Sequence, residues 1–173
     1  SEGVDKLKVL SVYGYTGSGK TSTIEQIIGE LIRRGYSVGS IKDIHFESFA
    51  IDTVGSNTDR HRKAGAELVT ARGIHETDVL FPKRLSVEQI LCFYSQDYVV
   101  MEGVTDTDAP KVLCAKNEEE IEQLINETVF AISGVISNKL SHYKGIPVIN
   151  SLKDAEAIVD LIEEKVKDYP ISR

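Results

Sequence analysis

The stretch that decides the fold runs from Ser11 to Ser22 and reads SVYGYTGSGKTS. It begins within a β-rich run, Lys8 to Tyr13, and residues 14–21 match the pattern G-x-x-x-x-G-K-[ST] of a phosphate-binding P-loop. Glycines let such a backbone curl so that successive N–H groups point inward, and the helix start that follows adds to the attraction for an anion. The stretch therefore predicts a site for the phosphates of a nucleotide.

The residues around the loop favour this interpretation over a glycine-rich turn with a surface lysine. Apolar residues recur downstream at helical spacing, so the loop joins a strand to an amphipathic helix that ends by Gly35. In a P-loop the lysine, here Lys20, reaches the β- and γ-phosphates, and the next hydroxyl, here Thr21, holds Mg²⁺. The predicted nucleotide-binding residues are Gly14, Tyr15, Thr16, Gly17, Ser18, Gly19, Lys20, Thr21 and Ser22.

The second half of a P-loop site is an acidic residue at the end of an apolar strand. Tyr98 to Met101 form such a strand, and Glu102 follows it directly. We expect Glu102 to hold Mg²⁺ through a water molecule, with Thr21 as the other metal-binding residue. The alternative is a strand-end carboxylate that caps the turn at Gly103.

Strands and helices alternate along the rest of the chain, which predicts an α/β fold of the P-loop NTPase type. We expect a mostly parallel sheet with helices on both faces and some antiparallel strands. Because no internal repeat or linker-like stretch interrupts the order, we expect residues 1–173 to form a single P-loop nucleotide-binding domain. The predicted strands are 8–13, 37–44, 67–71, 74–81, 98–101, 111–115, 129–136 and 146–149, and further helices are predicted at 57–66, from Ser86 to Tyr94, from Asn117 to Asn126 and at 154–167.

The composition is that of an ordinary globular protein and excludes several classes of function. Apolar residues make up 41% and charged residues 27% of the 173 residues, and the net charge is -7. An acidic chain argues against general binding to nucleic acid or to an anionic membrane, since both rely on excess Lys and Arg. No signal-peptide pattern or membrane-length apolar run is present, so we expect a cytoplasmic protein.

Three further stretches, taken in chain order with the P-loop, resemble one family. IKDIH at 41–45 follows the second strand, RHRKAGA at 60–66 opens a short helix, and MEGV at 101–104 leads to Pro110-Lys111-Val112. They resemble the MobB family, the molybdopterin-guanine dinucleotide biosynthesis protein B family, over nearly the whole chain. The resemblance implies a GTP-binding α/β protein, usually a homodimer, that assists the molybdenum cofactor guanylyltransferase in joining GMP to molybdopterin.

The chain departs from the family pattern after its second strand. The family reads roughly K-H-x-H-H-D there, whereas residues 42–47 read KDIHFE, so that only Lys42 and His45 match. Asp43 is either a residue near the γ-phosphate or a turn former at a strand end. His45 either contacts Mg²⁺ or phosphate or simply fills a loop.

Two other features keep alternative interpretations open. Arg60, His61, Arg62 and Lys63 form a basic run, which is either a solvated helix face or a patch for pterin phosphate or for an acidic partner. NKLS at 138–141 begins like the N-K-x-D motif of many GTPases, but Ser141 lacks the carboxylate that pairs with guanine. We interpret NKLS as a chance match, so that the preference for GTP comes from the resemblance alone.

Two classes of function follow from these patterns. The first is a GTP- and Mg²⁺-binding accessory protein, at most a slow GTPase, because no glutamine is placed to orient an attacking water. The second is a stand-alone P-loop NTPase or small-molecule kinase. No catalytic residue can be named for either.

Overall fold

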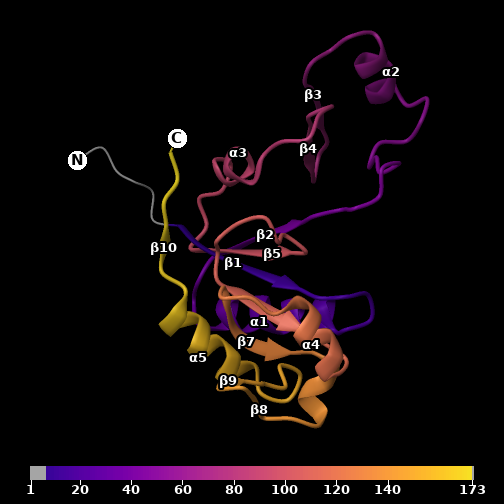
Figure 1. Cartoon of the computed structure of the whole chain (residues 1–173). Coiled ribbons are helices and arrows are strands. Elements are labelled where there is room, and N and C mark those ends of the chain that lie inside the picture. Colours follow the sequence, from indigo (N-terminus) through magenta and orange to yellow (C-terminus); the bar gives the residue numbers. More distant parts are fainter. Residues whose placement is uncertain (1–6, 173) are drawn as a thin grey trace. The chain divides into compact units, whose positions relative to one another are not determined.

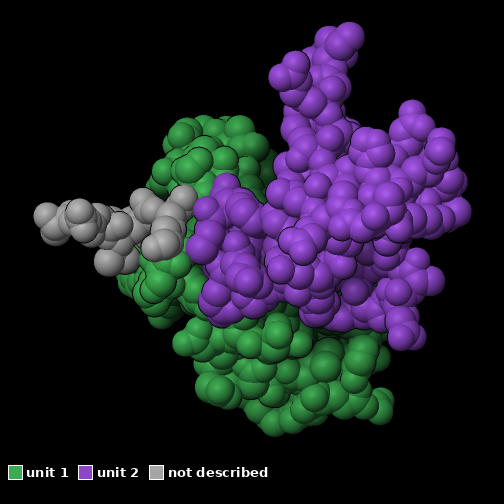
Figure 2. Space-filling view, turned by 90° about the horizontal axis from the view of Figure 1, so that it is seen from above, with its two compact units in different colours: residues 1–43, 94–173 green, residues 44–93 purple. Residues whose placement is uncertain are grey.

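The structure, a computed structural model, describes residues 7–172 and divides into two compact units. The first unit contains residues 7–43 and 94–172, and the second contains residues 44–93 (Figure 2). The prediction of a single nucleotide-binding domain over residues 1–173 stays a prediction. Among the described residues, no helix is long and apolar enough to cross a membrane.

The first unit is built on a six-stranded sheet (Figure 1). Five of its strands are parallel, and the sixth pairs with β1 in the antiparallel direction. Their order is β2 (Val38–Lys42), β5 (Tyr98–Glu102), β1 (Leu7–Tyr13), β6 (Lys111–Cys114) and β7 (Val129–Ser133), with β10 (Asp168–Tyr169) beside β1. Because both faces of this sheet are covered, β1 is a run of buried side chains interrupted only by Lys8.

Helices cover both faces of the sheet, as the sequence predicts. On one face, Val12 and Val100 pack with Ile27 of α1 (Lys20–Arg33) and Ile158 of α5 (Ala155–Lys165). On the other face, Tyr13 and its neighbours pack with α4 (Glu118–Leu124). The predicted α/β class, with a mostly parallel sheet and some antiparallel strands, is confirmed.

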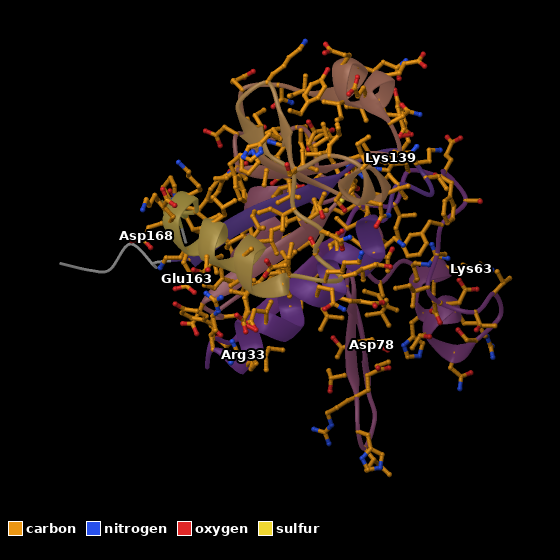
Figure 3. All side chains as sticks on the ribbon, turned by 90° about the horizontal axis from the view of Figure 1, so that it is seen from below. Arg33, Lys63, Asp78, Lys139, Glu163 and Asp168 are labelled. Atoms are coloured by element: carbon orange, nitrogen blue, oxygen red, sulfur yellow. The ribbon has the colours of Figure 1, made fainter. Side chains whose placement is uncertain are left out.

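A charged cluster joins the end of α1 to α5. The Arg33 guanidinium donates to Glu30 Oε2 at 2.6 Å, and Arg34 Nε donates to the same oxygen at 3.1 Å. Arg34 also pairs with Asp160 at 2.8 Å and with Glu163 on α5; Arg33 and Glu163 are labelled in Figure 3. The hydrogen bond from Arg33, followed by that from Arg34, lowers the pKa of Glu30 to about 2.

The second unit is small and has little core. It contains α2 (Asn57–Lys63), a hairpin of β3 (Val69–Arg72) and β4 (Thr77–Leu80), and α3 (Val87–Leu91). Asp59, Val69 and Leu91 are its only buried residues. Two-stranded hairpins are marginally stable alone, so this unit has little stabilisation of its own.

The structure differs from the predicted elements at several ends, and glycines explain two differences. The strand predicted to reach Ile136 ends at Ser133, because Gly134 takes φ +84° and a 3₁₀ helix, η1 (Val135–Asn138), follows. The helix predicted to reach residue 66 ends at Lys63, two residues before Gly65 at φ +112°.

Other differences involve short strands with weak sequence patterns. The predicted strand 146–149 is only a two-residue strand, β9 (Ile146–Pro147), paired with β8 (His142–Tyr143). The predicted strand 74–81 is four residues long, because its first residues form the hairpin turn. Neither β8 nor β10 was predicted from the sequence.

Replacing Glu30 by Gln should lower the free energy of unfolding at pH 7. The carboxylate has a depressed folded-state pKa, so its contribution is present above the ordinary value of about 4.3 and is lost as pH falls toward about 2. The stability gap between wild type and Glu30→Gln should therefore narrow between pH 5 and pH 3, as measured by urea denaturation. Glu25→Gln, exposed on the same helix, is the control, and a gap independent of pH would contradict this account.

Candidate functional site

The P-loop is a tight turn between β1 and α1 that its glycines make possible. Gly14, Gly17 and Gly19 have φ values of 155°, 78° and 100°. A Cβ atom on Gly14 would lie 2.1 Å from the carbonyl oxygen of Cys114, so no larger residue fits there. The loop can therefore curl tightly over the end of the sheet, as the sequence predicts.

The loop and the helix start present hydrogen-bond donors without partners inside the helix. Gly19 is the N-cap of α1 and supplies no side-chain cap, and the first intrahelical bond runs from Thr23 N–H to Gly19 O at 3.0 Å. The N–H groups of Lys20, Thr21 and Ser22 thus have no partner within the helix, whereas Ser18 N–H donates to Tyr15 O at 3.2 Å. Ser18 Oγ is the only buried side-chain oxygen or nitrogen without a partner among residues 7–172. An unpaired buried hydroxyl beside a helix N-terminus fits an oxyanion such as phosphate.

The predicted metal-binding residues come together beside the loop. Thr21 Oγ1 donates to Glu102 Oε1 at 3.1 Å, and Lys42 Nζ lies 3.5 Å from Glu102 Oε2. A hydroxyl and a carboxylate are oxygen ligands of the kind that Mg²⁺ prefers, directly or through water. The described residues contain no group of three or more His, Cys, Asp or Glu that could hold a metal alone. Mg²⁺ at Thr21 and Glu102 would therefore need phosphate and water to complete its coordination.

Lys20, the other predicted phosphate ligand, lies within the loop. Its Nζ donates to the carbonyl oxygen of Gly14 at 2.7 Å, across the mouth of the turn. A phosphate oxygen carries a full charge and is a stronger acceptor than this carbonyl. Lys20 could therefore exchange this carbonyl for a phosphate oxygen if a nucleotide binds in the loop.

The outer side of the loop is braced by neighbouring elements. Tyr15 Oη donates to Gln123 of α4 at 3.0 Å, and Lys116 Nζ lies 3.4 Å from Thr16 O. Val135 N–H donates to Ser18 O at 3.1 Å. These contacts fix the loop before any ligand binds, which reduces the ordering cost of binding.

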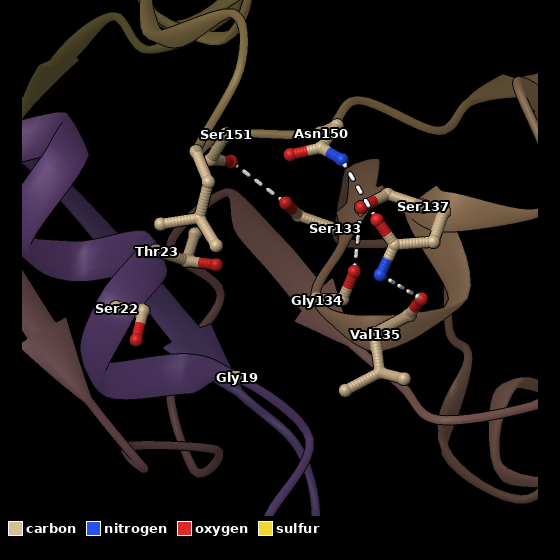
Figure 4. A pocket seen from close by; sticks show the side chains of 11 residues that line it. Gly19, Ser22, Thr23, Ser133, Gly134, Val135, Ser137, Asn150 and Ser151 are labelled. Carbon is tan, nitrogen blue, oxygen red and sulfur yellow. Dashed lines mark hydrogen bonds between the residues drawn. The ribbon is translucent and has the colours of Figure 1, made fainter.

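A pocket of about 200 Å³ opens directly beside the end of the loop (Figure 4). Its wall is formed by the first turn of α1, by the turn after β7 and by the segment after β9, and it carries no charged side chain. Asn150 Nδ2 donates to Asn138 Oδ1 at 3.1 Å, and the hydroxyls of Ser133 and Ser151 are 2.7 Å apart. The lining residues are Gly19, Ser22, Thr23, Ser133, Gly134, Val135, Ser137, Asn138, Asn150, Ser151 and Leu152. Neutral amides and hydroxyls suit an uncharged, polar, flat group.

Beneath the loop, Cys114 has a structural role. Its thiol is buried and donates to Thr23 Oγ1 at 3.5 Å. Burial raises the pKa of Cys114 to about 12, so the thiol stays protonated. Cys114 is therefore a core residue and not a nucleophile.

The remaining sequence candidates are Asp43, His45 and the basic run of α2. Asp43 follows β2, and its N–H donates to Glu102 O at 2.9 Å, which ties its backbone to the end of β5. His45 and the basic run of α2 belong to the second unit. There Arg62 and Lys63 pair with the buried Asp59 at 2.6 and 2.9 Å. The hydrogen bond from Gly55 N–H, together with these cations, holds the pKa of Asp59 well below its usual range.

Sequence reasoning missed most of the pocket. Asn138 begins NKLS, which from sequence alone is a chance match, yet its side chain lines the wall. Ser133, Gly134, Asn150 and Ser151 carry no recognisable motif. The one available signal was Gly134, a glycine directly after a buried strand, where a close approach of two backbones is common.

Gly134→Ala should weaken nucleotide binding strongly. A Cβ there would lie 2.1 Å from Ser18 O, so the P-loop would have to shift. Gly145→Ala is a matched control, because Gly145 has nearly the same φ, 83° against 84°, but no atom within 4 Å of its Cβ position. Titration of both variants with a fluorescent nucleotide tests this, and equal affinity in the two would contradict it.

Comparisons with known proteins point to one family. The profile of the family described as molybdopterin guanine dinucleotide synthesis protein B, MobB, matches residues 9–138. A probable molybdopterin-guanine dinucleotide biosynthesis adapter protein of Bacillus subtilis is 25% identical over 163 residues, which cover 92% of this chain and 93% of that protein. A molybdopterin-guanine dinucleotide biosynthesis adapter protein of Haemophilus influenzae is 29% identical over 119 residues, 66% of either chain.

Solved structures show the same fold. Bacillus subtilis MobB superposes with a TM-score of 0.73 at 24% identity, covering 92% of this chain and 98% of that chain. A MobB homolog from Bacillus stearothermophilus gives a TM-score of 0.67 at 24% identity, covering 90% and 96%. Since the family profile spans most of the sequence, from β1 to the end of η1, this chain belongs to the molybdopterin guanine dinucleotide synthesis protein B family.

Proposed function

We propose that this chain binds GTP with Mg²⁺ and acts as an adapter in the synthesis of molybdopterin guanine dinucleotide. The observation that carries the proposal is the continuity of the P-loop with the neutral pocket. Gly19, Ser22 and Thr23 end the phosphate loop and also line the pocket. Phosphates bound in the loop would therefore place the nucleoside beside a wall of amides and hydroxyls.

The parts of a nucleotide correspond to parts of this site. The loop N–H groups and Lys20 would bind phosphate oxygens, and Thr21 and Glu102 would hold Mg²⁺. Asn138 and Asn150 each carry an amide donor and an amide acceptor. Guanine presents both donors and acceptors on its edge, so these amides suit it, although the preference for guanine rests on the family.

The adapter role rests on the family and on the names of its relatives. The relatives from Bacillus subtilis and Haemophilus influenzae are called biosynthesis adapter proteins. We propose that the partner is the guanylyltransferase that attaches GMP to molybdopterin. A stand-alone NTPase or kinase would instead turn over rapidly without that partner.

GTP should bind more tightly than ATP, and Lys20→Ala should weaken GTP binding by about 100-fold or more. The variant would lose the charged hydrogen bonds from Lys20 to phosphate, which are worth about 1.5–3 kcal/mol each. Displacement of a fluorescent GTP analogue by unlabelled GTP and ATP, in wild type and in Lys20→Ala, measures the preference for GTP and the loss of affinity. Lys165→Ala, at the end of α5, is the control.

Three results would count against the proposal. Undiminished GTP affinity in Lys20→Ala would refute the phosphate site. ATP that competes as well as GTP would refute the guanine preference. Single-turnover hydrolysis on the order of 1 s⁻¹ or faster by the protein alone, the range typical of kinases, would favour a stand-alone enzyme over the adapter.

We also propose that the protein is a homodimer formed through the β3–β4 hairpin. Within the described chain, each of these strands pairs only with the other. Ile74, in the turn, is 94% exposed, and Val79 of β4 is 49% exposed. A second copy could extend the sheet and cover these apolar side chains, which a unit with so little core requires.

Light scattering should give a mass near twice the 19.1 kDa of one chain. Val79→Glu should shift the mass toward that of a monomer, because a charge would enter the apolar contact. Ile32→Glu is the matched control, since Ile32 is an exposed apolar residue of α1 at 57%. A wild-type monomer at high micromolar concentration would overturn the dimer.

A further inference from the structure

Lys42 is a cation beside the proposed Mg²⁺ site whose role the P-loop does not explain. It is the last residue of β2, and its Cα pairs in register with that of Glu102 at the end of β5. Its Nζ lies 3.5 Å from Glu102 Oε2, while Thr21 Oγ1 donates to the other oxygen, Oε1. The two oxygens of Glu102 therefore hold the metal-binding hydroxyl and a lysine at the same time.

The strand register fixes where Lys42 stands. Val12, Glu102 and Lys42 lie directly opposite one another on the three adjacent strands β1, β5 and β2. Residues opposite each other in a parallel sheet point to the same face, and Val12 packs in the core beneath α1. Lys42 is thus on the face that carries the N-terminus of α1, on the side of Glu102 away from β1.

Mg²⁺ at the proposed site and Lys42 would compete for one carboxylate. A divalent cation held by Thr21 and Glu102 would repel the ammonium of Lys42. It would also neutralise the Glu102 carboxylate that now pairs with Lys42. Lys42 is free to move, because its side chain is 67% exposed, against 14% for Glu102, and has a flexible stem. The nearest new negative charge is the terminal phosphate, since Mg²⁺ in P-loop sites bridges the β- and γ-oxygens.

We propose that Lys42 is held by Glu102 in the free protein and binds the γ-phosphate when GTP and Mg²⁺ enter. Lys42 then distinguishes a triphosphate from a diphosphate. Lys20 and the loop N–H groups, in contrast, bind both nucleotides. This inference rests on the proposed function, because it needs nucleotide in the P-loop. It adds a second lysine to the site, supplied by the end of β2.

The test compares a non-hydrolysable GTP analogue with GDP at saturating Mg²⁺. Lys42→Gln should weaken the triphosphate analogue by about 10- to 100-fold, the loss of one charged hydrogen bond, and should change GDP affinity by less than about threefold. Lys42→Arg should retain most of the preference for triphosphate, since it keeps the charge. Lys8→Gln is the matched control, because Lys8 also pairs with a carboxylate at 3.5 Å, that of Asp168, at the opposite end of the sheet.

Each other outcome has a separate meaning. If Lys42→Gln weakens both nucleotides equally, Lys42 supports the site without contacting the γ-phosphate, and the inference is wrong. If neither affinity changes, Lys42 does not contact nucleotide, and the inference is again wrong while the proposed function stands. If the wild-type protein binds neither nucleotide, the proposed function and this inference fall together.

Discussion

The site depends on close backbone packing around the P-loop that only glycine permits. A Cβ on Gly14 would lie 2.1 Å from Cys114 O, and a Cβ on Gly134 would lie 2.1 Å from Ser18 O. These two contacts bring the loop against the ends of β6 and β7. As a result, the turn after β7 lines a pocket together with the first turn of α1 and the segment after β9. The proposed phosphate and base positions follow from this packing.

Local patterns predicted the sheet and the phosphate loop. A glycine pattern between an apolar strand and an amphipathic helix has few structural solutions, so residues 14–22 and the α/β class could be predicted from sequence. Glu102 could be predicted because carboxyl ends of neighbouring parallel strands meet at one edge, where the structure places it 3.1 Å from Thr21. These features depend on residues near one another in sequence or on strand order.

The pocket could not be predicted in the same way, because its lining comes from three distant segments. Asn138 and Asn150 meet only after η1 and the β8–β9 hairpin fold the chain back. Gly134 changes the backbone direction by a positive φ that no periodic pattern reveals. The pairing of Lys42 with Glu102 likewise requires the register of β2 on β5. Tertiary packing, not local preference, decides these features.

Hydrogen exchange with and without GTP and Mg²⁺ tests the central claim, that the loop and the pocket form one nucleotide site. The account predicts slower amide exchange on binding at residues 14–23, near Glu102, at 133–138 and at 150–152, with no change along α5. Protection confined to residues 44–93, or none at the loop and the pocket under saturating nucleotide, would contradict it.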